Sequence, residues 1–297
     1  MPTPVATFWS GARMPALDQA CLSSFASDGH DIVVYSFEEF DGLPPGIARR
    51  DAREITQVSD LGAFLYKGVP NTSHFTDYFR YKMFQHTDST WIDTDLVALR
   101  DWPAGETDTL LARETEVGLC GAIMRLDPKA PYFPRLLEQT ERLKNTDLVW
   151  GATGPRLLTK LIGRETVVRN SYPPSKFFPI HFDAFWKPLL PEMRQECEQL
   201  CSEAYTLHLW NNIVVNLGYW KELAPPKDSY LWSIFASKNL LHLFRDEYPA
   251  DVMKRMVTNW HYRKSGGDIG IIKVAKQFIP SIGRTVGPRL RAIRQLR

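Results

Sequence analysis

The apolar positions of the first forty residues form two short contiguous runs, separated by a stretch with helical spacing. The two runs are VATFWSG (5–11) and HDIVVYSF (30–37), and the stretch between them is PALDQACLSSFASDG (15–29), which closes on a glycine. Three contiguous apolar residues, 32–34, are typical of a strand that is buried on both faces. A strand, a helix and a second strand in so short a span predict a βαβ unit, and therefore a parallel sheet.

Further along the chain, the apolar period predicts more strands and helices joined by irregular segments. A loop rich in proline and glycine (41–50) and an irregular stretch to about Thr72 come first. Further strands are expected at STWIDTDLVAL (89–99), TLLARET (109–115) and GLCGAIMRL (118–126). We expect helices at 75–86, 131–145 and 154–163, and short extended pieces at 165–173 and 177–183.

From residue 191 onward the pattern becomes mostly helical, with helices expected at 191–205, 230–248 and 250–260. Prolines and polar residues cluster at KELAPPKDS (221–229), which indicates a boundary. We therefore predict one domain over residues 1–225 and a helical extension with a basic amphipathic tail over 226–297. The predicted fold class is α/β: a mostly parallel sheet flanked by helices, followed by a C-terminal helical extension.

The composition supports a large core, because 44% of the 297 residues are hydrophobic and 12% are aromatic. The apolar runs, the N-terminal residues and the cysteines together predict a cytoplasmic protein. No apolar run approaches the roughly 18 residues of a membrane-spanning helix, and the N-terminal MPTPVATFWSG lacks the features of a secretory signal. The four cysteines fit a reducing compartment better than a disulfide framework. Cys197 and Cys201 share a helix face, but without a histidine at zinc-site spacing we expect them to pack rather than bind metal.

The net charge of +2 is unevenly distributed. Residues 254–297 carry 11 Lys/Arg and one acid, whereas the preceding 253 residues sum to −8. This segment mixes Ile, Val, Phe and Leu with Lys and Arg, which predicts a basic amphipathic surface for anionic lipid at the inner face of the cytoplasmic membrane. An exposed capping helix is the alternative, and flotation of intact and truncated protein with anionic vesicles would separate the two. We expect no nucleic-acid partner, because the chain lacks a recognisable reader motif.

Two aspartates, Asp93 and Asp95, follow the apolar pair Trp91-Ile92 at the predicted end of a strand. Functional groups of open α/β sheets gather at the carboxyl ends of strands. Two carboxylates there predict a site for Mn²⁺ or Mg²⁺, which bind through a few protein oxygens and leave positions for substrate phosphates. By spacing alone, an exposed turn with incidental acids is the favoured interpretation.

The preceding helix carries Asp77 and Arg80 three residues apart on one face, beside an apolar stripe of Phe75, Phe79 and Met83. One interpretation is an exposed ion pair worth a few tenths of a kcal/mol. The other is a sugar-binding pair, in which the arginine orients a carboxylate that accepts hydroxyl hydrogen bonds.

Taken together, FTDYFRYKMF…WIDTDLVAL resembles the DXD-containing glycosyltransferases of family 32, whose pattern is roughly Ser-Asp-x-x-Arg-Tyr followed by Tyr-Leu-Asp-x-Asp. That group includes bacterial capsule and lipopolysaccharide sugar transferases and eukaryotic α-1,4-galactosyl- and α-1,6-mannosyltransferases, and it is distantly similar to the clostridial toxin glucosyltransferase domains. FWSG, ATGPRLLT (152–159) and YTLHLWNN (205–212) also resemble its opening, its Gly-Pro helix and its late His-x-Trp. The resemblance covers about 5–215.

This resemblance implies a GT-A fold, a nucleotide-sugar donor of the UDP-sugar type, a divalent cation and retention of anomeric configuration. Asp93 and Asp95 would be the DXD metal ligands, with His208 approaching the metal or the diphosphate. Asp77 and Arg80 would hold donor-sugar hydroxyls. Trp210 would cover the donor, and Trp9 is a candidate wall for the uracil ring. From the residues alone, His208 could equally be a satisfied buried histidine, and both tryptophans could belong to the core.

Three departures from the family pattern bear on donor identity. HTDST (86–90) replaces a Gly-Gly before the strand, Gly121-Ala122 stands where an asparagine is expected, and Asn211-Asn212 replaces a Ser-Trp after the late histidine.

Retention is compatible with a covalent intermediate or with same-face attack, and we favour the second.

The predicted function is transfer of a hexose from a nucleotide sugar to a glycan or lipid-linked glycan in surface polysaccharide synthesis, such as that of capsule or lipopolysaccharide. The alternative is a catalytically idle sugar-nucleotide or glycan-binding protein on the same fold. A metal-dependent phosphodiesterase or nuclease ranks last, because it would need a denser cluster of acids and histidines.

Overall fold

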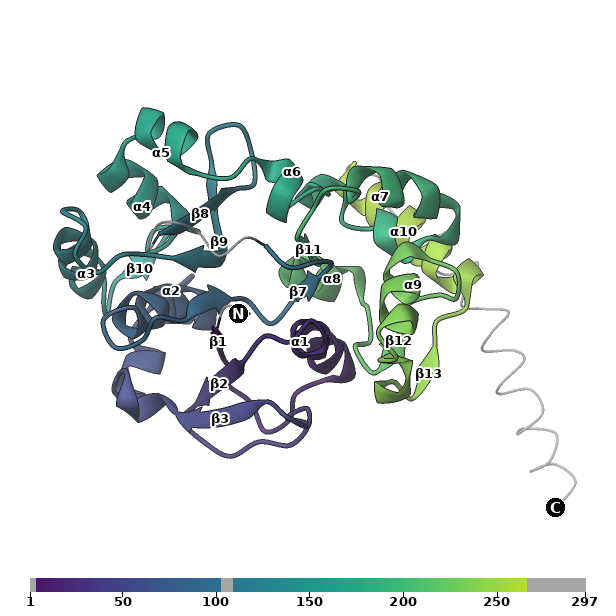
Figure 1. Cartoon of the computed structure of the whole chain (residues 1–297), viewed down its shortest axis with the longest axis horizontal. Coiled ribbons are helices and arrows are strands. Elements are labelled where there is room, and N and C mark those ends of the chain that lie inside the picture. Colours follow the sequence, from purple (N-terminus) through teal and green to yellow (C-terminus); the bar gives the residue numbers. More distant parts are fainter. Residues whose placement is uncertain (1–3, 103–108, 266–297) are drawn as a thin grey trace, which may run out of the picture. The chain divides into compact units, whose positions relative to one another are not determined.

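The computed structural model describes residues 4–102 and 109–265, and its centre is a six-stranded sheet (Figure 1). The strand order is β3-β2-β1-β6-β9-β8. Strands β1, β2, β3 and β6 pair in parallel, whereas β9 pairs antiparallel with both β6 and β8. The predicted α/β class with a mostly parallel sheet is therefore confirmed. The bounds are β1 Val5–Phe8, β2 Ile32–Ser36, β3 Ala48–Asp51, β6 Thr90–Ile92, β8 Leu110–Arg113 and β9 Leu119–Arg125.

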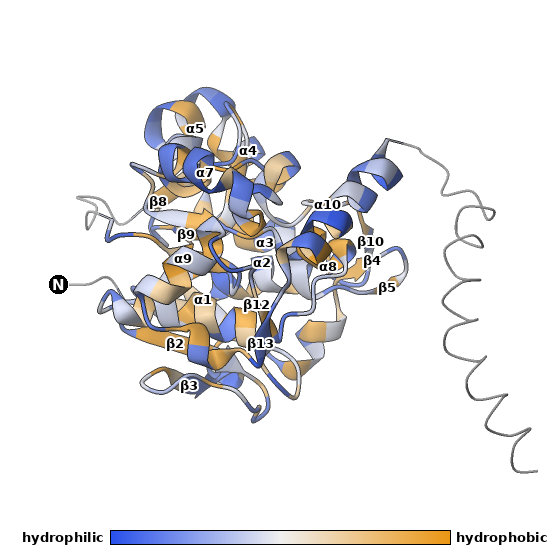
Figure 2. Ribbon diagram, turned by 90° about the vertical axis from the view of Figure 1, so that its right-hand side faces the viewer, coloured by the Kyte–Doolittle hydropathy of each residue, from blue (hydrophilic) through white to orange (hydrophobic). Residues whose placement is uncertain are grey.

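The predicted βαβ unit opens the fold, with α1 (Ala16–Ser27) crossing between β1 and β2. Val5 pairs with Ile32 and Phe8 with Tyr35 in the parallel register. All four residues of β1 are buried, which explains why its apolar run is contiguous rather than alternating. In Figure 2, β2 and β9 likewise carry hydrophobic colour along their length.

Helices cover both faces of the sheet, and each face has its own hydrophobic cluster. On one face, Phe75 and Phe79 of α2 (Thr72–Met83) pack with Phe8 and Trp91. On the other face, Phe25 of α1 lies in a cluster with Ile92 and Phe177. The first face is also covered by α3 (Phe133–Arg142) and α4 (Pro155–Ile162), whose Leu136 and Leu158 belong to its cluster.

Smaller elements complete the described structure. Strand β7 (Leu96–Ala98) pairs antiparallel with β11 (Thr206–His208), and β12 (Leu223–Ala224) pairs with β13 (Asp246–Glu247). A three-stranded sheet has the order β10-β4-β5. Its strands are β4 Leu65–Tyr66, β5 Val69–Pro70 and β10 Asp147–Leu148, and the remaining helices are α5 Arg164–Asn170, α6 Pro174–Phe177, α7 Arg194–Leu200, α8 Asn211–Leu217, α9 Tyr230–Ser237 and α10 Ala250–Lys264.

Several element predictions were wrong. Residues 165–173, predicted to be extended, contain helix α5, in which Val167 packs into the core. The strand predicted at 89–99 is two strands, because Asp93–Asp95 turns the chain from the central sheet to the β7–β11 pair. The helix predicted at 230–248 ends as α9 at Ser237, and a left-handed Asn239 follows. Strand β3 forms inside the predicted loop.

The chain divides into two compact units, Met1–Ala250 and Asp251–Arg297. The boundary predicted at 225/226 stays a prediction. Most of the basic tail predicted at 254–297 lies outside the described residues. Within the described ranges, no helix is long and apolar enough to cross a membrane. Cys21, Cys120, Cys197 and Cys201 are buried free thiols.

Candidate functional site

The loop Asp93-Thr94-Asp95 leaves the central strand β6 at the edge where the parallel strands end. The chain then enters β7, whose Leu96 pairs directly with His208 of β11. This antiparallel register places a histidine from late in the sequence beside the second aspartate. A backbone hydrogen bond from Leu209 N–H to the Asp95 carbonyl, at 3.0 Å, also joins these two segments of the chain.

Asp93, Asp95 and His208 form a compact cluster in which one potential ligand atom from each lies within 4.8 Å of the others. The His208 Nε2 atom is 3.2 Å from Asp95 Oδ2. One oxygen of Asp93 accepts a 2.7 Å hydrogen bond from the Trp91 indole. Two carboxylates and one imidazole are a donor set that suits Mn²⁺ among divalent cations. The three predicted metal ligands therefore converge, and the donor set fits the implied ion.

Burial and neighbouring charges shift the pKa values of the three side chains in this cluster. Burial raises the pKa of Asp93, against the opposing effect of Arg80. Burial also raises the pKa of Asp95, but this effect is outweighed. The charge and hydrogen bond of His208, the Asn211 N–H and the charge of Lys221 lower the pKa of Asp95 to about 2. Burial lowers the pKa of His208, and Asp95 more than offsets this, so that its pKa is raised. A cation binds only the neutral form of a histidine, so the raised pKa of His208 opposes cation binding as the pH falls.

Asp77 and Arg80 lie on the face of α2 that meets the sheet, so the surface ion-pair interpretation is wrong. Arg80 is only 3% exposed. Its Nη2 atom lies 3.5 Å from Asp77 Oδ1 and 3.4 Å from Asp93 Oδ1. Its Nη1 donates to the Gly121 carbonyl, and the guanidinium lies 4.6 Å from the centre of the Trp91 ring. One buried cation therefore connects the DXD loop to the Asp77 carboxylate.

The surroundings of Asp77 include residues that sequence reasoning did not predict. Thr153 Oγ1 donates to Asp77 Oδ2 at 2.8 Å, and His74 Nδ1 lies 2.9 Å from the same hydroxyl. Gly154 approaches so closely that a Cβ there would lie 2.5–2.8 Å from the carboxylate atoms. The sequence predicts a Gly-Pro helix at ATGPRLLT (152–159). That this stretch lies against Asp77 is apparent only from the tertiary structure.

The protonation of Asp77 is expected to make the free energy of unfolding depend on pH. Burial raises the pKa of Asp77 from 3.8 to about 6, despite the opposing effects of Arg80 and Thr153. Between these values the folded protein binds a proton that the unfolded chain does not. The stabilisation from this proton is therefore complete below about pH 4 and is lost as the pH rises through about 6.

We expect Asp77→Asn to remove this slope, which amounts to roughly 1–3 kcal/mol between pH 4 and 7. Urea denaturation in EDTA across that range measures it. Asp88→Asn serves as the control, because the Asp88 side chain is 98% exposed. Parallel pH profiles for Asp77→Asn and wild type would show that Asp77 does not titrate in this way.

A second ion pair, between Asp18 and Lys221, contacts the DXD loop. Asp18 of α1 is buried and accepts two hydrogen bonds from Lys221 Nζ, at 2.8 and 3.0 Å. The middle residue of the loop, Thr94, donates its hydroxyl to the same carboxylate at 3.2 Å. Burial raises the pKa of Asp18, and Lys221 opposes the shift. Neither Asp18 nor Lys221 was predicted, since their pairing joins segments far apart in sequence.

Lys221→Met is expected to destabilise the protein by about 2–3 kcal/mol, because it leaves the Asp18 carboxylate buried without a cation. This expected loss of stability is smaller than for a fully buried ion pair, because the Lys221 side chain is 15% exposed and water screens its charge. Guanidinium denaturation of this variant, of Lys160→Met on exposed surface, and of Asp18→Asn/Lys221→Met measures the effect. The double variant should recover part of the loss, and a double variant less stable than Lys221→Met would contradict this account.

The two predicted tryptophans have different positions. Trp210 lies against His208 with ring centres 4.0 Å apart and planes tilted by 42°, and its indole donates to the Ile180 carbonyl at 3.1 Å. Trp9 follows β1, which runs parallel to β6, so it leaves the sheet at the same edge as the DXD loop. Its ring lies 6.3 Å from that of Phe40. The donor-covering and uracil-stacking roles stay predictions.

Two of the three departures from the family pattern have local explanations. Gly121 leaves room for Arg80, whose Nη1 would collide with any Cβ there. The backbone N–H of Asn211 donates to Asp95 Oδ2 at 2.7 Å, so it is the main chain at this position, rather than the expected side chain, that contacts the cluster.

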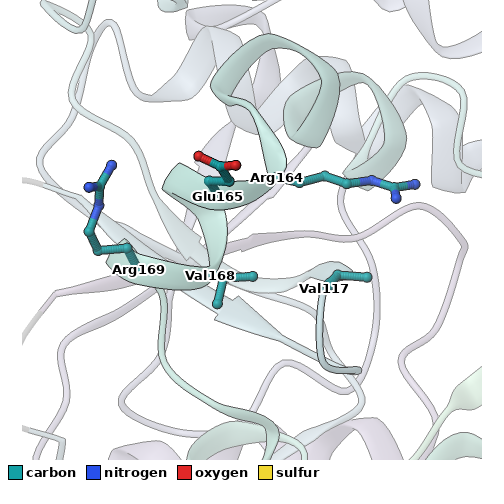
Figure 3. Close-up of a pocket in the computed structure, with 5 residues that line it drawn as sticks. All are labelled: Val117, Arg164, Glu165, Val168 and Arg169. Atoms are coloured by element: carbon teal, nitrogen blue, oxygen red, sulfur yellow. The ribbon is translucent and has the colours of Figure 1, made fainter.

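A surface hollow of about 390 Å³ is lined by α5 and the β8–β9 turn and lies apart from this cluster (Figure 3). In Figure 3 the two arginines that line it point in different directions. None of the candidate site residues lines it; its lining residues are Val117, Arg164, Glu165, Val168 and Arg169.

Comparison with known proteins agrees with the class predicted from the sequence. No family model matches the chain. Human lactosylceramide 4-alpha-galactosyltransferase is 23% identical over 133 residues, which cover 41% of this chain and 36% of the relative. The mouse protein is 26% identical over the same length, and the rat protein is 22% identical over 178 residues, or 54% of this chain and 48% of the relative. The chain thus spans between a third and a half of the curated relatives it matches.

Solved structures similar to this chain include the WbbM bifunctional glycosyltransferase (TM-score 0.45, 12% identity, covering 86% of this chain and 51% of that one). They also include GlyE of Streptococcus pneumoniae (TM-score 0.44, 13% identity, 89% and 64%) and mouse xyloside xylosyltransferase 1 (0.40, 13%, 71% and 99%). With TM-scores below 0.5, these structural similarities are weak. The curated relatives are glycosyltransferases, and the predicted resemblance to that class of enzyme is confirmed.

Proposed function

We propose that the protein is a metal-dependent, retaining glycosyltransferase that moves a hexose from a UDP-sugar to a glycan acceptor. The observation that carries the proposal is the convergence of Asp93, Asp95 and His208, joined by the buried Arg80 to Asp77. The curated relatives are named for α-galactosyl transfer to lactosylceramide. On that ground, UDP-galactose is the first donor to test and a lactosyl group the first acceptor.

In this proposal Asp93, Asp95 and His208 hold Mn²⁺, with Mg²⁺ as the second choice. When bound, the ion supplies positive charge that neutralises the diphosphate leaving group. Asp77 accepts hydrogen bonds from donor-sugar hydroxyls, and Arg80 fixes the orientation of its carboxylate. Because these groups are preorganised and largely buried, their electrostatic effect is stronger than in water.

Retention is proposed to proceed by attack on the same face of the sugar. The anomeric carbon–oxygen bond to the diphosphate breaks, and the acceptor hydroxyl oxygen forms a new bond on the face that the leaving group departs. The acceptor proton passes to the departing phosphate oxygen, so no protein base is required. In this proposal Trp210, whose ring contacts that of His208, excludes water from the donor.

Hydrolysis of UDP-sugars in the absence of acceptor tests the proposal. A panel containing UDP-galactose, UDP-glucose and their N-acetyl derivatives is incubated with the protein and Mn²⁺, and UDP release is followed. We expect slow release from at least one donor, and none in EDTA. If a donor raises the thermal stability but none is turned over, the alternative of an idle sugar-nucleotide-binding protein is favoured. A donor at a hundred times its Kd adds about 2.7 kcal/mol.

The acceptor is proposed to be lipid-linked, which would connect surface polysaccharide synthesis with the basic tail predicted at 254–297. Each cation near an anionic surface contributes about 1 kcal/mol at most. Association with the inner face of the cytoplasmic membrane therefore stays part of the proposal.

A further inference from the structure

A patch of exposed apolar side chains lies on the three-stranded sheet β10-β4-β5. Tyr66 of β4 pairs in register with Leu148 on one side and with Val69 on the other. Val69 is 60% exposed, and Trp150, just beyond β10, is 48% exposed. The Tyr66 and Trp150 rings meet edge to face with their centres 5.8 Å apart. We call these two rings the aromatic platform. Exposed apolar patches on soluble proteins commonly mark binding surfaces.

The platform is held rigidly by the turn beneath it. Lys67 and Gly68, which join β4 to β5, both have positive φ, as a tight two-residue hairpin requires. The Gly68 N–H donates to Asp147 Oδ1 at 3.0 Å, which ties the turn to β10. The Lys67 ammonium lies 5.3 Å from the centre of the Tyr66 ring. The platform therefore combines two flat rings with a charged rim on a fixed backbone.

His74 connects the platform to the candidate site. Its ring centre lies 6.0 Å from that of Tyr66 and 5.9 Å from that of Trp150. On its other side, its Nδ1 atom contacts Thr153 Oγ1, which donates to Asp77 Oδ2. Only two side chains thus separate the platform from the carboxylate proposed to bind the donor sugar.

The hydrogen bonds also determine the tautomer of His74. The single Thr153 hydroxyl proton goes to Asp77, so His74 must donate from Nδ1 and keep a lone pair on Nε2. This Nε2 atom is buried and has no hydrogen-bond partner among the described residues. The three rings of Tyr66, His74 and Trp150 contact one another, so the platform lies directly over a buried polar atom without a partner in the described part of the chain, a feature that calls for an explanation.

We infer that Tyr66 and Trp150 form a subsite that binds a sugar ring of the glycan acceptor. The inference rests on the proposed function, since it supplies the second substrate of that reaction. A pyranose ring has an apolar C–H face and a rim of hydroxyls. Tyr and Trp match this combination, because each presents a flat apolar body and a polar atom at low entropic cost.

A glycan fits this surface better than a protein does. A stable protein interface buries about 800 Å² on each partner, whereas this platform consists of two rings with a few aliphatic neighbours. Only His74 and Thr153 separate the platform from Asp77, the carboxylate proposed to bind the donor sugar. A protein partner is therefore the competing outcome of the test.

The test uses Trp150→Ala, the ring-preserving Trp150→Phe, and Trp220→Ala as a matched control. Trp220 is 53% exposed and lies between α8 and β12, away from the platform. The full chain is first applied to a printed array of mammalian and bacterial glycans, together with methyl β-lactoside in solution. The strongest oligosaccharide is then titrated by calorimetry against each variant. Donor hydrolysis with Mn²⁺ is measured in parallel.

We expect Trp150→Ala to weaken glycan binding by about tenfold or more while donor hydrolysis is unchanged. Trp150→Phe should retain most of the affinity, and Trp220→Ala should match wild type. If Trp150→Ala does not fold, as judged by near-ultraviolet circular dichroism, Tyr66→Leu takes its place with the same expected result.

The inference is overturned if glycan affinity does not depend on either ring, or if wild type hydrolyses a donor but binds no oligosaccharide. The proposed function fails separately if no donor is hydrolysed; ring-dependent glycan binding in that case would still support the subsite. Glycan affinity that is the same in wild type and in both ring variants would favour a protein-docking surface instead.

Discussion

Asp95→Asn is expected to lower the rate of UDP-sugar hydrolysis by at least about 10²–10³-fold, the effect of removing one preorganised charge-stabilising group. Asp95 is the member of the cluster that contacts His208 and the Asn211 N–H, and its pKa of about 2 keeps it ionised at every working pH. The amide removes the negative charge that we propose binds the cation, while keeping the size of the side chain. Mn²⁺ affinity, followed by electron paramagnetic resonance, should fall together with the rate.

Asp88→Asn is the matched control, since it removes one carboxylate from an exposed position. It should leave both the rate and Mn²⁺ binding at the wild-type level. Excess Mn²⁺ should recover part of the Asp95→Asn rate if the loss lies in cation binding. Full activity of Asp95→Asn at limiting Mn²⁺ would remove this residue from the metal site.

The second large effect is expected for Arg80→Met, which should destabilise the protein by about 3–5 kcal/mol. Arg80 is the cation between Asp77 and Asp93, and its removal leaves two carboxylates with reduced compensation in a buried region. Methionine keeps much of the side-chain volume, so the loss reports charge more than packing. Guanidinium denaturation measures it, and donor hydrolysis should fall in the fraction that remains folded.

Arg142→Met is the matched control, because Arg142 pairs with Glu138 on the exposed face of α3. Such surface pairs contribute about 0–1 kcal/mol. Combining Arg80→Met with Asp77→Asn removes one of the unpaired charges, so the double variant should be more stable than Arg80→Met alone. Strict additivity of the two changes would show that Arg80 and Asp77 are not coupled.

Local patterns predicted much of this arrangement. The contiguous apolar residues of β1 and β2 indicated a parallel sheet, and the acids after Trp91-Ile92 indicated a site at its carboxyl edge. The three-residue spacing of Asp77 and Arg80 placed both on one helix face. Each of these features depends on a short segment whose period or position carries the information.

Other features could not be read from the chain. The strand predicted at 89–99 breaks at Asp93 because β7 pairs with β11 rather than continuing in the central sheet, and that choice depends on residues 206–208. Thr153 and Gly154 line Asp77, and Lys221 neutralises Asp18, through contacts between distant segments. No local period encodes such contacts, because they arise when separate hydrophobic faces pack together.

By itself, the sequence determined the α/β class, the acids at the end of β6 and the polar face of α2, since each follows from spacing within one element. The tertiary structure decided that His208 meets Asp95, that Arg80 bridges Asp77 to Asp93, and that Tyr66 and Trp150 meet each other. The physical reason is that strand register and helix packing are set by long-range burial, which brings together side chains that no short stretch of sequence places side by side.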